Sequence, residues 1–268
     1  NDEQKALGIP VEENVKLANA TNPNIETIRK SMIPTQLCQI KSNTGFAPDF
    51  GIFEIGRVVD GLNSDNKCNE KKMLAITLFS KTKNIRELYI GLRDMLAVIA
   101  DDLKHKELTF EETAAVHSYE HPVNLNKIIL DGTTIGTMAI AHPVVSKKID
   151  KKANIVFAEI DVNKLASVSS AGITYSEPSK FPTMTYDLSL ILSKDMYFGK
   201  LKQCWTSVDC DILKNTKIVD TYDTELIHSI TVRFEFSSNE RTLSMEEVQA
   251  VMDKVMENLK NAGVKLRA

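Results

Sequence analysis

Apolar residues recur at every second position in several short runs of the last third of the chain, and runs with helical spacing separate them. Leu188, Leu190 and Leu192 share one side of a strand predicted over residues 186–192, and the same alternation predicts a strand over residues 229–236. The pattern predicts the order strand, helix, strand, strand, helix, strand, over residues 186–192, 196–205, 217–222, 229–236, 244–263 and 264–267.

Both ends of the second predicted helix are marked by local residues. Ser244 is a good N-cap residue, and Glu247 follows at the spacing that lets the two side chains bond two free N–H groups reciprocally. Gly263 suits the left-handed conformation that ends a helix. Two helices on one face of an antiparallel four-stranded sheet form the ferredoxin-like βαββαβ arrangement. Many unrelated functions use this fold, so it does not identify a function by itself.

The first part of the chain predicts an antiparallel sheet with helices packed on it, which is an α+β domain. Residues 50–59 are rich in Phe, Ile and Val and predict a buried strand, and residues 85–103 predict the longest helix, with an apolar stripe that ends at Leu103. Asp131-Gly132 predicts a hairpin turn, and Asn22-Pro23-Asn24 predicts another turn. The remaining strands are expected over residues 15–18, 73–79, 126–130, 136–141 and 155–160, and the remaining helices over residues 33–41 and 143–149.

Five sequence words in the last third occur in a characteristic order: FPTMTYDLSLIL, VDTY, HSITVRFEF, NERTLSMEEV and GVKLR. Together they resemble the ferredoxin-fold anticodon-binding domain that closes the β subunit of bacterial phenylalanyl-tRNA synthetases. Upstream, IRKSMIP, FEIGRV, AHP and VFAEI resemble the catalytic-like domain of the same subunit. The resemblance predicts a C-terminal fragment, and the Asn1 start agrees with that expectation. We expect an inactive class II synthetase-like domain over residues 1–170, a linker over 171–180 and the anticodon-binding domain over 181–268.

The resemblance also implies four tRNA-binding residues, namely Asp220, Tyr222, Ser229 and Arg267. Asp220 and Tyr222 hold the acidic and aromatic positions of the family's Phe-Asp-x-Tyr word, and alternation places them on one face. An aspartate can accept hydrogen bonds from a guanine edge, and a tyrosine ring can stack on a base. Ser229 would add a hydrogen bond, and Arg267 would meet a phosphate or a base edge. Taken alone, Asp220 also fits a solvated strand charge, and Tyr222 a half-buried sheet residue.

Charge argues against strong RNA binding by this domain. From Ser176 onward the chain has 12 Lys and Arg residues against 14 Asp and Glu residues, whereas a domain that binds RNA through phosphates is normally basic. Val264 replaces the aromatic residue often found after the glycine, and Tyr186 replaces an arginine of the family's first strand. An assembly module that binds no RNA is therefore the alternative prediction.

No catalytic residue and no metal ligand are predicted. Arg57 is the only arginine near the end of the strand that resembles class II motif 2, no Arg-x-Glu follows it, and motif 3 is absent, so we interpret it as structural. His142 is expected to end a strand, with Pro143 at the first helical position. The other histidines and the four cysteines lack metal-ligand spacing, and the cysteines fit reduced, mostly buried thiols of a cytosolic protein.

The resemblance implies a holoenzyme that joins phenylalanine to its tRNA at the expense of ATP, with Mg²⁺. The α subunit of a heterotetramer would supply the active site, and phenylalanine tRNA would be the nucleic-acid partner. The fragment itself is expected to hold no cofactor and to be inactive alone. No apolar run reaches the roughly 18 residues of a membrane-spanning helix, and no signal peptide is evident, so a cytoplasmic location is expected.

Overall fold

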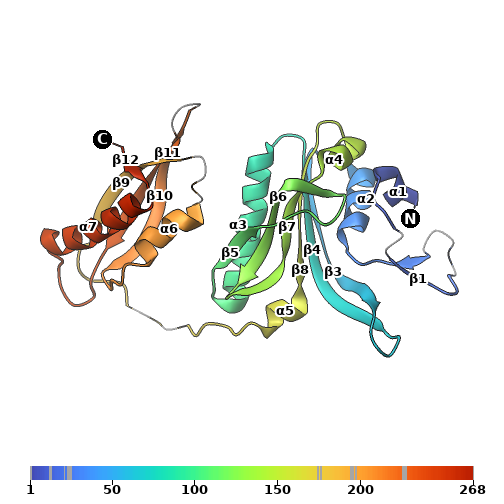
Figure 1. Cartoon of the computed structure of the whole chain (residues 1–268), viewed down its shortest axis with the longest axis horizontal. Coiled ribbons are helices and arrows are strands. Elements are labelled where there is room, and N and C mark those ends of the chain that lie inside the picture. Colours follow the sequence, from blue (N-terminus) through green and yellow to red (C-terminus); the bar gives the residue numbers. More distant parts are fainter. Residues whose placement is uncertain are drawn as a thin grey trace. The chain divides into compact units, whose positions relative to one another are not determined.

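A computed structural model describes residues 2–11, 14–20, 22, 26–173, 175, 177–193, 196, 198–224 and 228–267. The chain folds as two units, Asn1–Ile173 and Thr174–Ala268, which are called unit 1 and unit 2 below (Figure 1). The boundary between the units lies within residues 171–180, the segment predicted to be a linker. Of the turn predicted at Asn22-Pro23-Asn24, Pro23 and Asn24 lie outside the described residues.

Unit 1 is built on a six-stranded sheet in which all neighbouring strands are antiparallel. The order across the sheet is β3 (Asp49–Leu62), β4 (Cys68–Ser80), β8 (Asn154–Asp161), β7 (Thr133–Ala141), β6 (Glu120–Leu130) and β5 (Leu108–Glu112). A separate two-stranded ladder joins β1 (Val15–Lys16) to β2 (Thr27–Ile28). The helices are α1 (Asp2–Leu7), α2 (Ile33–Asn43), α3 (Ile85–Lys104), α4 (Pro143–Ile149) and α5 (Val162–Ser167).

Helices cover both faces of this sheet (Figure 1). The stripe of α3 packs on one face through Leu88, Leu92 and Leu96, while α2 packs on the opposite face together with α1 and α4. The α3 helix begins at a capping box between Asn84 and Glu87, as helix-start chemistry favours. Its last turn ends at His105, which adopts the left-handed conformation with a φ of 53°.

The strand predicted to be buried is instead the edge strand β3. Phe53 is 76% exposed and Ile55 is 57% exposed, because α3 packs on β8, β4, β5 and β7 and does not extend over β3. Leu103 was also expected in the buried stripe, but it is exposed at the end of α3. Cys38 and Cys204 are buried as predicted, whereas Cys68 is exposed. The sequence pattern therefore predicted that β3 and α3 exist, but it did not predict which of their side chains the tertiary fold buries.

Unit 2 has a four-stranded antiparallel sheet, and its strand order confirms the ferredoxin-like prediction. The order is β10 (Leu213–Asp223), β11 (His228–Phe236), β9 (Met184–Leu192) and β12 (Lys265–Leu266). The helices α6 (Phe198–Thr206) and α7 (Met245–Asn261) pack on one face (Figure 1). The predicted capping box of Ser244 and Glu247 is present, and Gly263 has a φ of 78°.

Alternation along β11 separates the two faces of this sheet. Val232, Phe234 and Phe236 are buried against the helices, and Trp205 of α6 meets Phe234 edge to face with ring centres 5.5 Å apart. The polar residues of β11 point to the opposite face. We call this opposite side the open face; it carries Asp220, Tyr222, Ser229, Thr231 and Arg233 together with their cross-strand neighbours.

Candidate nucleic-acid interface

The pairing of strands places Asp220, Tyr222 and Ser229 on the open face, and the side-chain contacts of Arg267 place that residue beside Tyr222 and Ser229. Tyr222 pairs with Ser229, and Asp220 pairs with Thr231. The register shifts between Ile218 and Asp220, so Val219 is an extra residue in β10. Without this bulge Asp220 and Tyr222 would share the helix-facing side with Ile218, because a one-residue shift moves every later side chain to the other face.

Three of these residues are in direct contact. The guanidinium carbon of Arg267 lies 4.8 Å from the ring centre of Tyr222, which is a cation–π geometry. Nη1 of Arg267 also donates to Oγ of Ser229 at 3.2 Å. The backbone N–H of Arg267 donates to the carbonyl oxygen of Ser189 at 2.8 Å and holds the backbone of Arg267 on the sheet beside β9. Ser229 is only 4% exposed, whereas Tyr222 is 47% exposed.

Asp220 lies on the same face but outside this group of three. Its side chain is exposed, and its neighbour Thr231 is hydrogen-bonded to Ser189 at 2.9 Å between hydroxyl oxygens. Asp220 and Tyr222 are two positions apart along the strand, which is about 7 Å along the backbone. A base stacked on the tyrosine ring would therefore lie within reach of the carboxylate.

Most charges of the open face are already paired with one another. Arg233 donates to both carboxylate oxygens of Asp187 at 2.8 and 2.7 Å, and this hydrogen bonding holds the pKa of Asp187 below its ordinary value. Lys217 meets Glu235 at 2.6 Å and likewise lowers the pKa of that carboxyl. Among the described residues, Lys265 and Arg267 form no ion pair with a carboxylate. These two cations lie at the β12 edge of the face.

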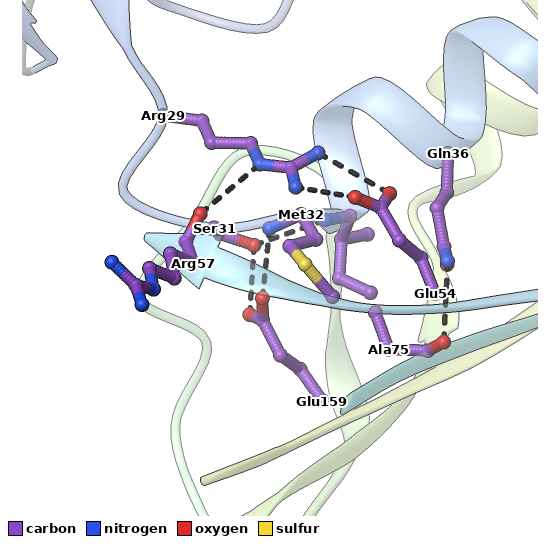
Figure 2. A network of polar contacts seen from close by, with 9 residues as sticks. Arg29, Ser31, Met32, Gln36, Glu54, Arg57, Ala75 and Glu159 are labelled. Carbon is purple, nitrogen blue, oxygen red and sulfur yellow. Dashed lines mark hydrogen bonds and ion pairs between the residues drawn. The ribbon is translucent and has the colours of Figure 1, made fainter. Parts of the chain in front are cut away.

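A second polar cluster lies in unit 1, around the beginning of α2 (Figure 2). The carboxylate of Glu159, from β8, accepts hydrogen bonds from the backbone N–H of Met32 at 2.7 Å and from the hydroxyl of Ser31 at 2.8 Å. Burial raises the pKa of Glu159, and the two hydrogen bonds oppose that shift. Arg29 lies nearby and donates hydrogen bonds to both carboxylate oxygens of Glu54. These contacts join α2 to the sheet.

Sequence reasoning missed Glu159, although the word VFAEI contains it. The only signal was an isolated acid within a strand that is otherwise apolar. The interpretation of His142 is confirmed, since its Nδ1 accepts from the N–H of Val144 and Pro143 opens α4. Arg57 is ion-paired with Glu70 at 3.0 Å. Within the described part of the chain, no group of three or more potential metal-ligating side chains is found.

Unit 1 also carries an apolar hollow of about 720 Å³ between β3, β4 and α3. The sheet contributes Phe53, Ile55, Leu74 and Ile76, and the helix contributes Met95, Val98 and Ile99. Several of these side chains are exposed, which is unusual for so many large apolar residues in one place.

The described helices include none with the length and apolar composition of a membrane-spanning segment.

Comparison with protein-family models assigns both units. Residues 1–162 match the model described as the phenylalanyl tRNA synthetase beta chain CLM domain. The chain belongs to this family. Residues 179–267 match the ferredoxin-fold anticodon binding domain. The resemblance to phenylalanyl-tRNA synthetase β subunits predicted from the sequence is therefore confirmed.

Individual relatives agree with the family assignment. The chain is 26% identical to the phenylalanine–tRNA ligase beta subunit of Bacillus subtilis over 275 residues, covering 97% of this chain and 34% of the relative. The corresponding subunit of Aquifex aeolicus is also 26% identical, with the same coverage of each chain. That of Campylobacter jejuni is 25% identical over 99% of this chain and 34% of the relative. The chain thus spans about a third of the length of these family members.

Proposed function

We propose that this chain is the part of a phenylalanine–tRNA ligase β subunit that docks the anticodon stem-loop of phenylalanine tRNA on the open face of unit 2. The observation that carries this proposal is the match of unit 2 to an anticodon-binding domain. The contact of Tyr222, Ser229 and Arg267 on that face supports it, because it combines a stacking ring with two hydrogen-bonding groups.

In this proposal each of the four residues has a distinct role. The ring of Tyr222 stacks on an anticodon base, and the carboxylate of Asp220 accepts hydrogen bonds from a guanine edge. The hydroxyl of Ser229 adds a hydrogen bond, and Arg267 meets a phosphate or a base edge. Because most charges of the face are paired internally, recognition relies on a few splayed bases more than on phosphate contacts.

The test is binding of phenylalanine tRNA to the α/β holoenzyme with Asp220→Ala or Tyr222→Ala. Loss of a stacked base costs about 1–3 kcal/mol, so Tyr222→Ala should weaken tRNA binding by about 5- to 150-fold. Asp253→Ala on α7, on the opposite side of the sheet, is the matched control. Fluorescence of Trp205, the single tryptophan of this chain, checks in the isolated chain that unit 2 of each variant remains folded. If neither change weakens affinity or aminoacylation, the anticodon role fails and the assembly-module alternative replaces it.

Unit 1 in this proposal packs against the α subunit, which supplies the active site of a cytoplasmic heterotetramer. ATP and Mg²⁺ would serve that active site, and no residue of this chain is assigned to either. The relatives are named beta subunits, which implies a complex. The chain alone should then catalyse no phenylalanine-dependent ATP–pyrophosphate exchange. Exchange above a no-enzyme control would refute this part of the proposal.

The apolar hollow is the surface of unit 1 that we assign to the α subunit. A partner that fills it would bury Phe53, Ile55 and Val98, which water now contacts. Val98→Asp should therefore reduce co-purification of the α subunit with the chain. Leu103→Asp, at an exposed position of the same helix outside the hollow, is the matched control. Equal recovery of the α subunit with both variants would place the interface elsewhere.

A further inference from the structure

One side chain covers two of the groups that anticodon recognition would use. The Arg267 guanidinium lies over the Tyr222 ring at 4.8 Å, and the same group donates to the Ser229 hydroxyl at 3.2 Å. Ser229 is 4% exposed, although its side chain lies on the open face of the sheet. Asp220 remains exposed and takes no part in this contact.

A base cannot use this platform while the guanidinium lies on it. Both the guanidinium and a nucleobase are planar and stack on a tyrosine ring through the same face. The hydroxyl of Ser229 already accepts a hydrogen bond from Arg267. A base that approaches this ring face must therefore take the place of Arg267 before it can stack or reach Ser229.

We propose that the Arg267 side chain covers the stacking face of the Tyr222 ring in the free protein, and that an incoming anticodon base displaces it. This inference rests on the proposed anticodon function and specifies how its site opens. Rotation of the guanidinium away from the ring uncovers the stacking surface and the Ser229 hydroxyl in one step. The carboxylate of Asp220 is accessible in both states, so the cover controls stacking and leaves the guanine-edge contact unaffected.

The structure provides what such an exchange requires. The backbone of Arg267 is fixed to β9 through its N–H bond to Ser189, so only the side chain has to move. Arg267 has no carboxylate partner among the described residues, so its release breaks no ion pair. By contrast, Arg233 on the same face is held by two hydrogen bonds to Asp187 and is not free to exchange. Once released, the Arg267 guanidinium can donate to the RNA that displaced it.

The first test follows the Arg267 side chain by NMR in the full chain labelled with ¹⁵N-arginine. The Arg267 Nε–H resonance should carry an upfield ring-current shift that Tyr222→Leu removes. Saturation with a stem-loop RNA carrying the anticodon GAA should remove the same shift in the wild-type chain. A retained shift in the bound complex would refute the displacement of Arg267 from the Tyr222 ring and leave the anticodon function intact. Failure of the stem-loop to bind at all would overturn the function and the cover together.

The second test uses guanosine, which has no phosphate for Arg267 to contact. Arg267→Met should bind guanosine about two- to fivefold more tightly than wild type, the factor that a cation–π contact at an exposed site is worth. This gain should disappear in the Tyr222→Leu background and persist in the Asp220→Ala background. Equal, weaker or undetectable guanosine binding by Arg267→Met would refute the proposal. Trp205 fluorescence verifies that each variant retains a folded unit 2.

Discussion

Replacing Glu159 with alanine removes the acceptor at the beginning of α2, whereas replacing it with glutamine keeps one. Two buried donors depend on this carboxylate, the Met32 N–H at 2.7 Å and the Ser31 hydroxyl at 2.8 Å. A glutamine oxygen can still accept from Met32, and its amide nitrogen can donate to the Ser31 oxygen. Glutamine therefore keeps both the shape and the hydrogen bonding of the wild-type side chain, whereas alanine removes both.

The expected magnitudes follow from the burial of these donors. An unpaired buried donor costs about 1–3 kcal/mol, and loss of the desolvated charge offsets part of this cost. Glu159→Ala should therefore destabilise unit 1 by about 2–4 kcal/mol. Glu159→Gln should stay within about 1 kcal/mol of the wild type near neutral pH, because its bonds persist and no charge is buried.

The pH dependence has a definite sign. Burial raises the pKa of Glu159 above the ordinary value of 4.5, so the folded state holds this proton more tightly than the unfolded state. The contribution of Glu159 to stability is therefore greatest below 4.5 and decreases as pH rises through the folded pKa. Glutamine does not titrate, so the stability of Glu159→Gln relative to wild type should increase across this window.

Urea unfolding of the full chain can measure both effects. Far-UV circular dichroism reports the two units together, while fluorescence of Trp205, which is 2% exposed in the core of unit 2, reports that unit alone. The variants should shift the transition of unit 1 and leave the fluorescence transition unchanged. A Glu159→Ala chain as stable as the wild type would refute the capping role. A difference between Gln and Glu that is independent of pH would refute the pKa argument.

Three further predictions concern the open face and the packing of each unit. If Arg267 and Lys265 are the only phosphate contacts, the logarithm of the binding constant should fall with the logarithm of the salt concentration with a slope of about −0.7 per contact. Raising the salt concentration from about 50 to 200 mM should then weaken stem-loop binding roughly sevenfold. A thousandfold loss of affinity in a filter-binding assay would contradict the internal pairing of the other charges. Gly136→Ala should destabilise unit 1 by at least about 1–3 kcal/mol, because its new Cβ would lie 2.2 Å from the carbonyl oxygen of Glu159. Gly91→Ala is the control, because open space surrounds that position and no clash is expected. Equal urea midpoints for the two variants would refute the clash at Gly136. Hydrogen bonds from Arg241 lower the pKa of Glu247 to about 2, so its contribution to the stability of unit 2 is complete above about 4.5 and is lost as pH falls toward 2. Arg241→Met should shift that loss to higher pH in acid titrations followed by Trp205 fluorescence, and an unchanged titration would exclude the pairing.

Features set by neighbouring residues could be predicted from the sequence. The caps of α7 depend on Ser244, Glu247 and Gly263, which lie in or next to the ends of that helix. The turn at Asp131-Gly132 depends on two adjacent residues with positive φ. Alternation located β9 and β11 because each strand has one face against the helices. These signals come from neighbouring residues, so they can be recognised in the sequence without knowledge of the fold.

Features set by distant pairings could not be predicted in the same way. The exposure of Phe53 depends on β3 being an edge strand, which the strand order determines. Glu159 caps a helix that begins more than a hundred residues earlier in the chain. The contact of Arg267 with Ser229 needs β12 beside β9 and β9 beside β11. The roles predicted for Asp220, Tyr222, Ser229 and Arg267 came from family resemblance, and no periodicity alone would identify them.

The charge balance of unit 2 shows why composition is a poor guide to this interface. A small acidic excess suggested weak RNA binding, but an excess averaged over the unit does not say which charges are available. Arg233 and Lys217 are neutralised by Asp187 and Glu235, so counting them as phosphate contacts would overestimate the electrostatic attraction. Arg267 is paired with an aromatic ring and a hydroxyl, and both of these are groups that a base can replace. Under the binding mode proposed above, Arg267 both offers a charge to RNA and controls access to the stacking surface, so binding would depend on base identity more than on net charge.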